Sequence, residues 1–217
     1  MTQRALIFAN GDVNDGPMVQ RAIAGWQDTL RIAADGGART AAALDVPVTI
    51  VIGDMDSLSS DELADLEPRA EILRYPPEKN ETDLELALLY AVAHGATWIR
   101  IVGAVGDRLD QTLSNVYLMA LPALAKVSVR MVAGKQETWL MGAGQHTIEG
   151  QAGDTLSLIP LNGTVRGVQT DGLYYPLRDE DLIFGPARGV SNVMNGAKAG
   201  VTVREGVLLV VHTLGRA

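Results

Sequence analysis

The chain has 217 residues and 47% of them are hydrophobic, which is enough apolar material for one large globular domain or two small ones. It contains no cysteine, so disulfide frameworks and thiolate metal sites are excluded. The formal net charge of −8 argues against a protein that binds nucleic acid, and no apolar run reaches the length of a membrane span. We therefore expect a cytoplasmic globular protein, in which a metal assists if phosphate is a ligand.

Residues 4 to 134 alternate between strand-like and helix-like segments. The predicted strands cover residues 5–10, 30–34, 48–52, 70–75, 98–102 and 127–132. The predicted helices cover residues 17–26, 38–44, a short segment opened by 59–62, 82–94 and 110–121. Strands that alternate with helices imply parallel pairing with right-handed crossovers. We predict an α/β domain over residues 1–134, with a mostly parallel sheet sandwiched by helices.

After Gly134 the helix-length periodic segments disappear and short β-like runs replace them. These runs cover residues 137–140, 146–148, 155–160, 163–168, 200–204 and 207–213. Glycines recur between the runs, as turns between short antiparallel strands require. We predict a smaller all-β domain over residues 135–217, arranged as an antiparallel sandwich or barrel. Apolar alternation on both sides of Glu205-Gly206 predicts a hairpin at that dipeptide.

Acidic or glycine-rich segments follow several strands of the predicted α/β domain. Asp35 follows the second strand, Asp54 and Asp56 follow the third, Asp83 opens the long helix, and residues 103–111 follow the fifth strand. In a parallel sheet these segments emerge at one edge, where open α/β proteins bind ligands. Taken singly, Asp35 and Asp83 are better interpreted as helix N-caps. Several carboxylates at one edge, without histidine or cysteine, suit Mg²⁺.

The segment from Gly103 to Gln111 has features of a phosphate-binding loop. Its glycines let the backbone approach a ligand, Arg108 can clamp a phosphate, and a helix N-terminus follows. The segment lacks the Lys-Ser/Thr end of a P-loop and the spacing of a dinucleotide fingerprint. Neither of those two families is therefore supported.

Five motifs together resemble the thiamine pyrophosphokinases. In chain order they are Ala34-Asp35-Gly36-Gly37-Ala38, Gly53-Asp54-Met55-Asp56-Ser57, Thr82-Asp83-Leu84-Glu85-Leu86-Ala87, Gly103-Ala104-Val105-Gly106-Asp107-Arg108-Leu109-Asp110-Gln111 and Gly189-Val190-Ser191-Asn192. Each motif alone is weak, but the ordered set spans nearly the whole chain. The resemblance implies an α/β domain followed by a β domain. It also implies an enzyme that transfers a pyrophosphoryl group from ATP to the hydroxyl of thiamine, giving thiamine diphosphate and AMP.

The same resemblance implies the roles of individual residues. The catalytic and magnesium-site acids that it implies are Asp54, Asp56, Asp83 and Asp110. The implied ATP contacts are Gly103, Arg108, Asp110 and Gln111, and the implied thiamine contacts are Asp35, Tyr175, Ser191 and Asn192. Tyr175 stands where the family often has a tryptophan, and Asn80 stands where an acid is common, so position 80 is not counted as a ligand. A homodimer with active sites in clefts between subunits is also implied.

Two other functions remain open from the residues alone. One is a non-catalytic sensor of nucleotide or thiamine, although binding by itself does not require so many acids. The other is a metal-dependent phosphohydrolase that uses water in place of the alcohol, which leaves the aromatic and Ser-Asn residues of the β domain unexplained. In the transferase hypothesis, Asp110 or Asp35 accepts the proton of the attacking alcohol.

Overall fold

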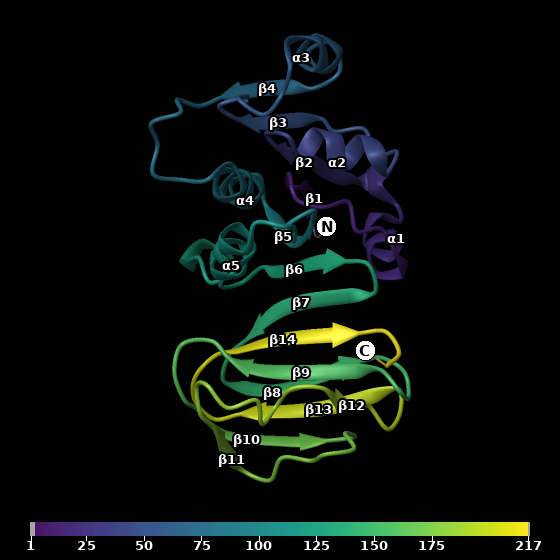
Figure 1. Cartoon of the computed structure of the whole chain (residues 1–217), viewed down its shortest axis with the longest axis vertical. Helices are drawn as coiled ribbons and strands as arrows, with labels where there is room; N and C mark the ends of the chain where they lie inside the picture. The colour runs from purple at the N-terminus through teal and green to yellow at the C-terminus, as the bar shows by residue number, and fades with distance from the viewer. Residues whose placement is uncertain (1–2, 217) are drawn as a thin grey trace. The chain divides into compact units, whose positions relative to one another are not determined.

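The computed structural model describes residues 3 to 216 and divides into two compact units, Met1–Gly134 and Lys135–Ala217 (Figure 1). The first unit mixes helices with a parallel sheet, and the second consists of antiparallel strands. The predicted fold class, an α/β unit followed by a β unit, is confirmed. Across residues 3–216, every helix is too short or too polar to cross a membrane.

The described part of the first unit contains a parallel sheet of six strands. They are β1 (Gln3–Phe8), β2 (Thr29–Ala34), β3 (Ile50–Gly53), β4 (Glu71–Arg74), β5 (Ala96–Val102) and β6 (Ser128–Ala133). Their spatial order is β6-β5-β1-β2-β3-β4. The chain builds outward from β1 to β4 and then returns to place β5 on the other side of β1. Strand order therefore reverses between β1 and β5, and such a switch point opens a crevice at the carboxyl edge of a sheet.

Helices cover both faces of this sheet. They are α1 (Pro17–Ile23), α2 (Gly37–Ala43), α3 (Ser60–Leu66), α4 (Asp83–Ala93) and α5 (Leu109–Leu118), with short 3₁₀ turns at Trp26–Asp28 (η1) and Pro122–Leu124 (η2). Figure 1 shows α1 and α2 on one face of the sheet and α4 and α5 on the other. The longest helix, α4, buries Leu84, Ala87, Leu88 and Ala91, which lie on one helical stripe. It packs on β1, β2, β3 and β5.

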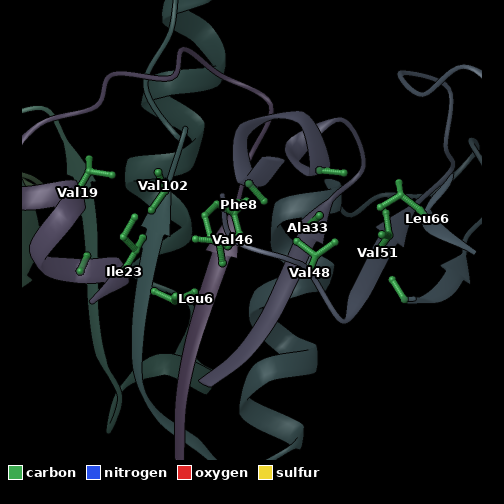
Figure 2. Close-up of a cluster of buried hydrophobic side chains, with 14 of the residues drawn as sticks. Leu6, Phe8, Val19, Ile23, Ala33, Val46, Val48, Val51, Leu66 and Val102 are labelled. Atoms are coloured by element: carbon green, nitrogen blue, oxygen red, sulfur yellow. The ribbon is translucent and has the colours of Figure 1, made fainter. Parts of the chain in front are cut away.

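A hydrophobic cluster fills the space between the sheet and the helices of the α1 and α2 face (Figure 2). Leu6 and Phe8 of β1 point into it because alternate residues of a strand share a face. Val19 and Ile23 of α1 pack from the opposite side, and Val102 joins from β5. The cluster therefore fixes the carboxyl ends of β1 and β5, where the strand order reverses.

Two predicted helices are shorter than expected, and each has a local cause. The helix predicted over residues 17–26 ends at Ile23, since Gly25 adopts a positive φ of 72° and begins a 3₁₀ turn. The helix predicted over residues 110–121 ends at Leu118. Leu121 has an extended ψ of 132°, as expected for a residue that precedes a proline.

The second unit is a sandwich of short antiparallel strands. They are β7 (Gln136–Met141), β8 (Gly144–Glu149), β9 (Thr155–Pro160), β10 (Val165–Asp171), β11 (Glu180–Leu182), β12 (Asn192–Val193), β13 (Lys198–Val203) and β14 (Leu208–Thr213). They pair in the orders β12-β9-β14-β7 and β11-β10-β13-β8, and both sets bury side chains in one shared cluster. The strands β11 and β12 were not predicted, because each has too few residues to show an alternating pattern.

The hairpin predicted at Glu205-Gly206 is wrong. Strand β13 pairs with β8 and β10, whereas β14 pairs with β7 and β9, so the two strands lie in different sheets. The favoured two-residue hairpin turns need a positive φ at the first central residue. Gly206 has a φ of 100°, but Glu205 is not among the residues with positive φ. The dipeptide instead forms a corner, and Glu205 forms a bridge with Arg166.

Candidate functional site

A cavity of about 630 Å³ lies at the carboxyl edge of the parallel sheet in the first unit. Its walls come from the loops that follow β1, β2, β3 and β5 and from the start of α4 and α5. These loops surround the position where the strand order reverses. The cavity therefore occupies the position in which open α/β proteins place their ligands.

Three carboxylates converge on this cavity. Asp35, Asp54 and Asp83 each offer one oxygen, and these oxygens all lie within 4.8 Å of one another. Asp35 is only 4% exposed, and its Oδ1 atom is buried without a hydrogen-bond partner among the described residues. Its Oδ2 accepts a hydrogen bond from the backbone N–H of Ser57 at 3.2 Å. A buried, unpaired oxygen within a group of acids that lacks sulfur and imidazole fits Mg²⁺.

Gly53 allows the three carboxylates to meet. It has a φ of 152°, and a Cβ atom at this position would lie 2.9 Å from Asp83 Cγ and 3.0 Å from Asp35 Cβ. Asp35 and Met55 also adopt positive φ values, of 45° and 65°. Such backbone conformations are costly for residues other than glycine, and they cluster at functional sites.

Lys79 lies among the same carboxylates. Its Nζ is 3.0 Å from Asp54 Oδ2 and 3.0 Å from Asp83 Oδ1, and its side chain is 10% exposed. The hydrogen bond from Lys79 lowers the pKa of Asp54, whereas burial raises the pKa of Asp83. Burial opposes the charge on Lys79, but hydrogen bonds to Asp83 and Asp54 outweigh this effect and raise its pKa. Lys79 is absent from the predicted site residues, because it lies in the loop before α4 and no sequence pattern places it among these acids.

Asp56 and Asp110, the other two predicted metal-site acids, do not belong to the cluster of Asp35, Asp54 and Asp83. Asp56 is exposed at the edge of the cavity, where its backbone N–H donates to Asp54 Oδ1 at 3.2 Å. Asp110 is exposed at the start of α5 and pairs with Arg108 through Nε at 2.9 Å and Nη2 at 2.5 Å. The hydrogen bond from Arg108 lowers the pKa of Asp110 to about 2. Arg108 itself lines the cavity.

Two glycine turns lie against each other on the cavity wall. Gly103 has a φ of 73°, and a Cβ there would lie 2.4 Å from the carbonyl oxygen of Ala9. The backbone N–H of Gly11 donates to the carbonyl of Gly103 at 2.7 Å, and that of Asp12 donates to Val105 at 2.9 Å. The first strand therefore contributes its own loop to the site. This loop was not predicted, although it ends at the same sheet edge as the other site segments.

Side chains of α5 hold the Gly103 turn in place. The amide of Asn115 donates to the carbonyl oxygen of Ala104 at 2.8 Å, and Thr112 Oγ1 accepts from the backbone N–H of Gly106 at 3.3 Å. The predicted ATP contact Gln111 lies on the same helix and lines the cavity. The turn and the start of the helix thus form one wall.

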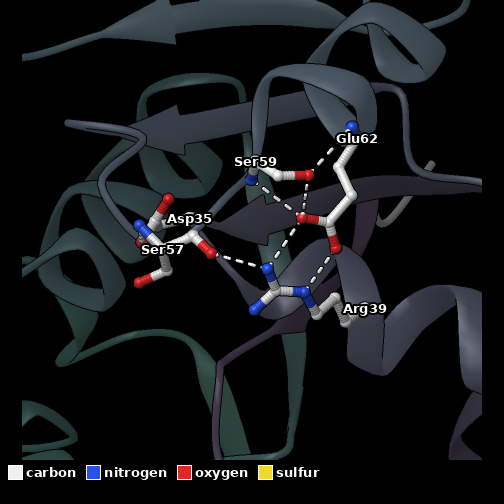
Figure 3. Close-up of polar contacts among 5 residues, drawn as sticks. All are labelled: Asp35, Arg39, Ser57, Ser59 and Glu62. Carbon is white, nitrogen blue, oxygen red and sulfur yellow. Dashed lines mark hydrogen bonds and ion pairs between the residues drawn. The ribbon is translucent and has the colours of Figure 1, made fainter.

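An ionic network supports the loop that carries Asp54 (Figure 3). Arg39 of α2 makes a two-point ion pair with Glu62 of α3, and its Nη2 also donates to the carbonyl oxygen of Ser57 at 2.7 Å. Glu62 is held in turn by Ser59 through a capping box at the start of α3. The hydrogen bond from Arg39 lowers the pKa of Glu62 to about 2. The backbone N–H of Ser57 also donates to Asp35, so the network extends to the three converging carboxylates.

The remaining predicted residues lie in the second unit. The side chain of Asn192 is buried and makes two hydrogen bonds with Tyr175, accepting from its N–H at 2.9 Å and donating to its carbonyl at 2.7 Å. Tyr175 as a whole is 57% exposed, and its ring is in edge-to-face contact with Tyr174. Ser191 has a positive φ of 58°, and its N–H donates to Ser157 Oγ at 3.0 Å. Asn192 thus positions an exposed aromatic pair.

Two family models match the sequence, one in each unit. The first is described as thiamin pyrophosphokinase, catalytic domain, and matches residues 24–132. The second is described as thiamin pyrophosphokinase, vitamin B1 binding domain, and matches residues 145–208. Together they account for most of both units.

Individual proteins show the same similarity. A thiamine pyrophosphokinase of Bacillus subtilis (strain 168) is 26% identical over 195 residues, which cover 88% of this chain and 91% of that protein. A crystal structure of thiamine pyrophosphokinase from Bacillus subtilis has a TM-score of 0.85 at 24% identity, covering 98% of this chain and 99% of the other. The yeast thiamin pyrophosphokinase structure has a TM-score of 0.82 at 15% identity, covering 98% and 87%. At these identities the structural similarity shows the fold.

Proposed function

Because the chain belongs to the thiamin pyrophosphokinase family, we propose that it transfers the pyrophosphoryl group of ATP to the hydroxyl of thiamine, forming thiamine diphosphate and AMP. The observation that carries this proposal is the convergence of Asp35, Asp54 and Asp83 on a cavity that also contains Arg108. Phosphoryl transfer depends mainly on charge neutralisation and alignment, which such a site supplies.

The proposal includes magnesium, held by Asp54 and Asp83, while Asp35 adjoins these two acids and Asp56 lies at the cavity edge. Magnesium held there would neutralise the charge of the phosphate oxygens. The thiamine oxygen forms a bond to the β-phosphorus of ATP, the bond from that phosphorus to the AMP oxygen breaks, and the alcohol proton passes to a carboxylate. Among these acids Asp35 is the most buried, and it is the one proposed to accept the proton of the alcohol. Asp110 is held by Arg108 instead, which supports a role at the nucleotide side of the cavity.

Different residues are proposed to bind the two substrates. The Gly103 turn, Arg108 and Gln111 line the cavity and suit the phosphates of ATP. In the second unit, Tyr175 presents an exposed aromatic face that suits the cationic ring of thiamine, and Ser191 and Asn192 adjoin it.

A homodimer in the cytoplasm completes the proposal. Support for self-association comes from α5, where Leu109, Leu113 and Tyr117 are exposed at i, i+4 and i+8 on one side of the helix. The absence of cysteine is compatible with a reducing compartment.

One assay tests the reaction and separates it from its alternatives. Purified protein is incubated with ATP and magnesium, with and without thiamine, and AMP and thiamine diphosphate are quantified. We expect both products only when thiamine and magnesium are present. AMP or ADP release without thiamine would instead support a phosphohydrolase, and thiamine binding without any product would support a sensor.

Substitution of the acids tests the site. We expect Asp54→Asn and Asp83→Asn to lower kcat by about 100-fold or more, since disturbing even the outer partners of a metal ligand costs about 10–100-fold. Asp65→Asn, an exposed acid on α3, is the matched control and should keep its activity. Full activity in the Asp54 and Asp83 variants would show that the assignment of these acids is wrong.

A further inference from the structure

The ammonium group of Lys79 lies against two of the three converging carboxylates. It is 3.0 Å from Asp54 Oδ2 and 3.0 Å from Asp83 Oδ1, two of the three acids whose oxygens converge. Its side chain is only 10% exposed, so water screens these contacts poorly. Lys79 is therefore already the counter-ion of the acids that are proposed to hold magnesium.

Lysine and magnesium compete for the same oxygens. A bound Mg²⁺ ion takes its oxygen ligands at about 2.0–2.1 Å, and an ammonium group within hydrogen-bond distance of two of those oxygens occupies the same space. Two cations so close together also repel each other strongly where screening is poor. Magnesium binding at Asp54 and Asp83 therefore requires the ammonium to leave.

The position of Lys79 in the chain permits this movement. It lies between β4 and α4, outside any helix or strand, and its backbone N–H donates to Pro77 at 3.0 Å. The long, unbranched lysine stem can reorient without moving the backbone. Lys79 also lines the cavity together with Arg108, so the departing ammonium stays among groups that attract anions.

We propose that Lys79 is an internal cation that occupies the metal position of the free protein and moves onto the nucleotide phosphates when magnesium binds. This inference rests on the proposed function for the identity of the nucleotide. Under this proposal, magnesium binds weakly when nucleotide is absent, because the displaced ammonium of Lys79 then has no hydrogen-bond acceptor. Phosphate oxygens supply that acceptor, so metal and nucleotide strengthen each other's binding.

Calorimetric titration of nucleotide-free protein with magnesium chloride tests the exchange without using activity. We expect Lys79→Met, which removes the competing charge, to bind Mg²⁺ tighter than the unmodified protein, on the order of tenfold. Lys79→Arg keeps the charge and should stay close to the unmodified protein. Lys198→Met, at an exposed lysine of the second unit, is the control for loss of any one positive charge and should not change the affinity.

The outcomes are distinguishable. Equal or weaker Mg²⁺ binding by Lys79→Met, or equal tightening in Lys79→Arg, overturns the proposal. If Lys79→Met does not fold, Lys79→Gln replaces it as the neutral variant. In the assay with thiamine, Lys79→Met should raise the KM for ATP, because the phosphates lose a cation. If the unmodified protein makes no thiamine diphosphate but Lys79→Met still binds Mg²⁺ tighter, the proposed function fails while the metal exchange stands.

Discussion

At the scale of single residues, Gly53 controls whether the three carboxylates can meet. A Cβ at this position would lie 2.9 Å from Asp83 Cγ, and its φ of 152° is unfavourable for any side chain. We expect Gly53→Ala to destabilise the fold by about 1–3 kcal/mol. It should also lower kcat by about 100-fold, since a shift of the order of 1 Å in a catalytic group has that effect. Urea unfolding and the AMP assay measure the two effects.

Gly142 supplies the matched control for this substitution. A Cβ at Gly142 would meet nothing within 4 Å, and its φ is not positive. Gly142→Ala should therefore be close to neutral in both measurements. If Gly53→Ala behaved in the same way as Gly142→Ala, close packing of the acids would not depend on the glycine.

The sequence predicts the sheet edge at which the acids of the site gather, but it does not predict which of them converge. Asp35, Asp54 and Asp83 were all expected at this edge because the segments that follow parallel strands emerge there together. The presence of Asp35 in the group depends on its own positive φ, which no hydrophobic pattern reveals. Lys79 lies in a loop whose path is set by tertiary contacts. Asp110 was expected in the metal site only because of its position in a motif, and the sequence does not show that it pairs with Arg108 instead. The expected grouping of Asp35 with Tyr175 joins two separate units and stays a prediction.

At the scale of secondary-structure elements, the Arg39–Glu62 pair joins α2 to α3 and supports the loop between β3 and α3 (Figure 3). Arg39 also holds the carbonyl of Ser57, whose N–H contacts Asp35. We expect Arg39→Gln and Glu62→Gln each to raise the magnesium concentration needed for half-maximal activity severalfold. The double variant should resemble either single one, since both remove the same interaction. Magnesium titrations of the AMP assay measure this.

An exposed ion pair elsewhere provides the comparison. Arg204 lies 3.2 Å from Asp179 in the second unit, and both side chains are largely exposed. Arg204→Gln removes one arginine without touching the loop and should leave the magnesium requirement unchanged. Additive effects of Arg39→Gln and Glu62→Gln would mean that the two residues act separately, which contradicts a role in positioning the loop.

Elements with long, regular patterns were predictable, and short or context-dependent ones were not. The helix α4 was predicted within one residue at each end because its apolar positions repeat with helical period. The pairing of β13 and β14 was wrong because alternation identifies strands but does not identify their partners. Both strands bury alternate residues in one cluster from opposite sheets, and sequence alternation is the same in either arrangement.

At the scale of the whole molecule, the fold class followed from the change from helix-rich to strand-rich segments near Gly134. The strand order did not, because hydrophobic patterns carry no information on which strands are neighbours. The return of β5 to the side of β1 creates the crevice and thereby decides which loops form the site. The loop after β1 was missed for this reason, although its sequence, Asn10-Gly11-Asp12, is polar and glycine-containing.

Stability of the whole chain should depend on pH through a buried histidine in the second unit. His212 is 1% exposed, and its Nε2 lies 2.8 Å from Asp154 Oδ2 while its Nδ1 lies 3.6 Å from Glu137 Oε1. Asp154 also accepts backbone hydrogen bonds from Gly215 and Gln151. Burial disfavours charge on both groups, yet these contacts outweigh it, so the pKa of His212 is raised and the pKa of Asp154 is lowered.

The two pKa shifts set the range of pH in which the pair stabilises the fold. The contribution of His212 is fully present below the pKa of an unfolded histidine, about 6.5, and is lost as pH rises through its raised folded value. The contribution of Asp154 is present above the pKa of an unfolded aspartate, about 3.9, and is lost as pH falls through its lowered folded value. We therefore expect His212→Gln to lower the Tm most between about pH 5 and 6.5.

Thermal unfolding of the full chain at several pH values measures this effect. The difference in Tm between the unmodified protein and His212→Gln should be several degrees at pH 6 and should shrink steadily as pH rises, since only the charged imidazole is stabilised by the two acids. His146→Gln is the control, because the ring of His146 contacts the backbone carbonyl of Gly142 instead of a carboxylate. A Tm difference for His212→Gln that stayed the same across this range would mean that His212 stabilises the fold through packing alone.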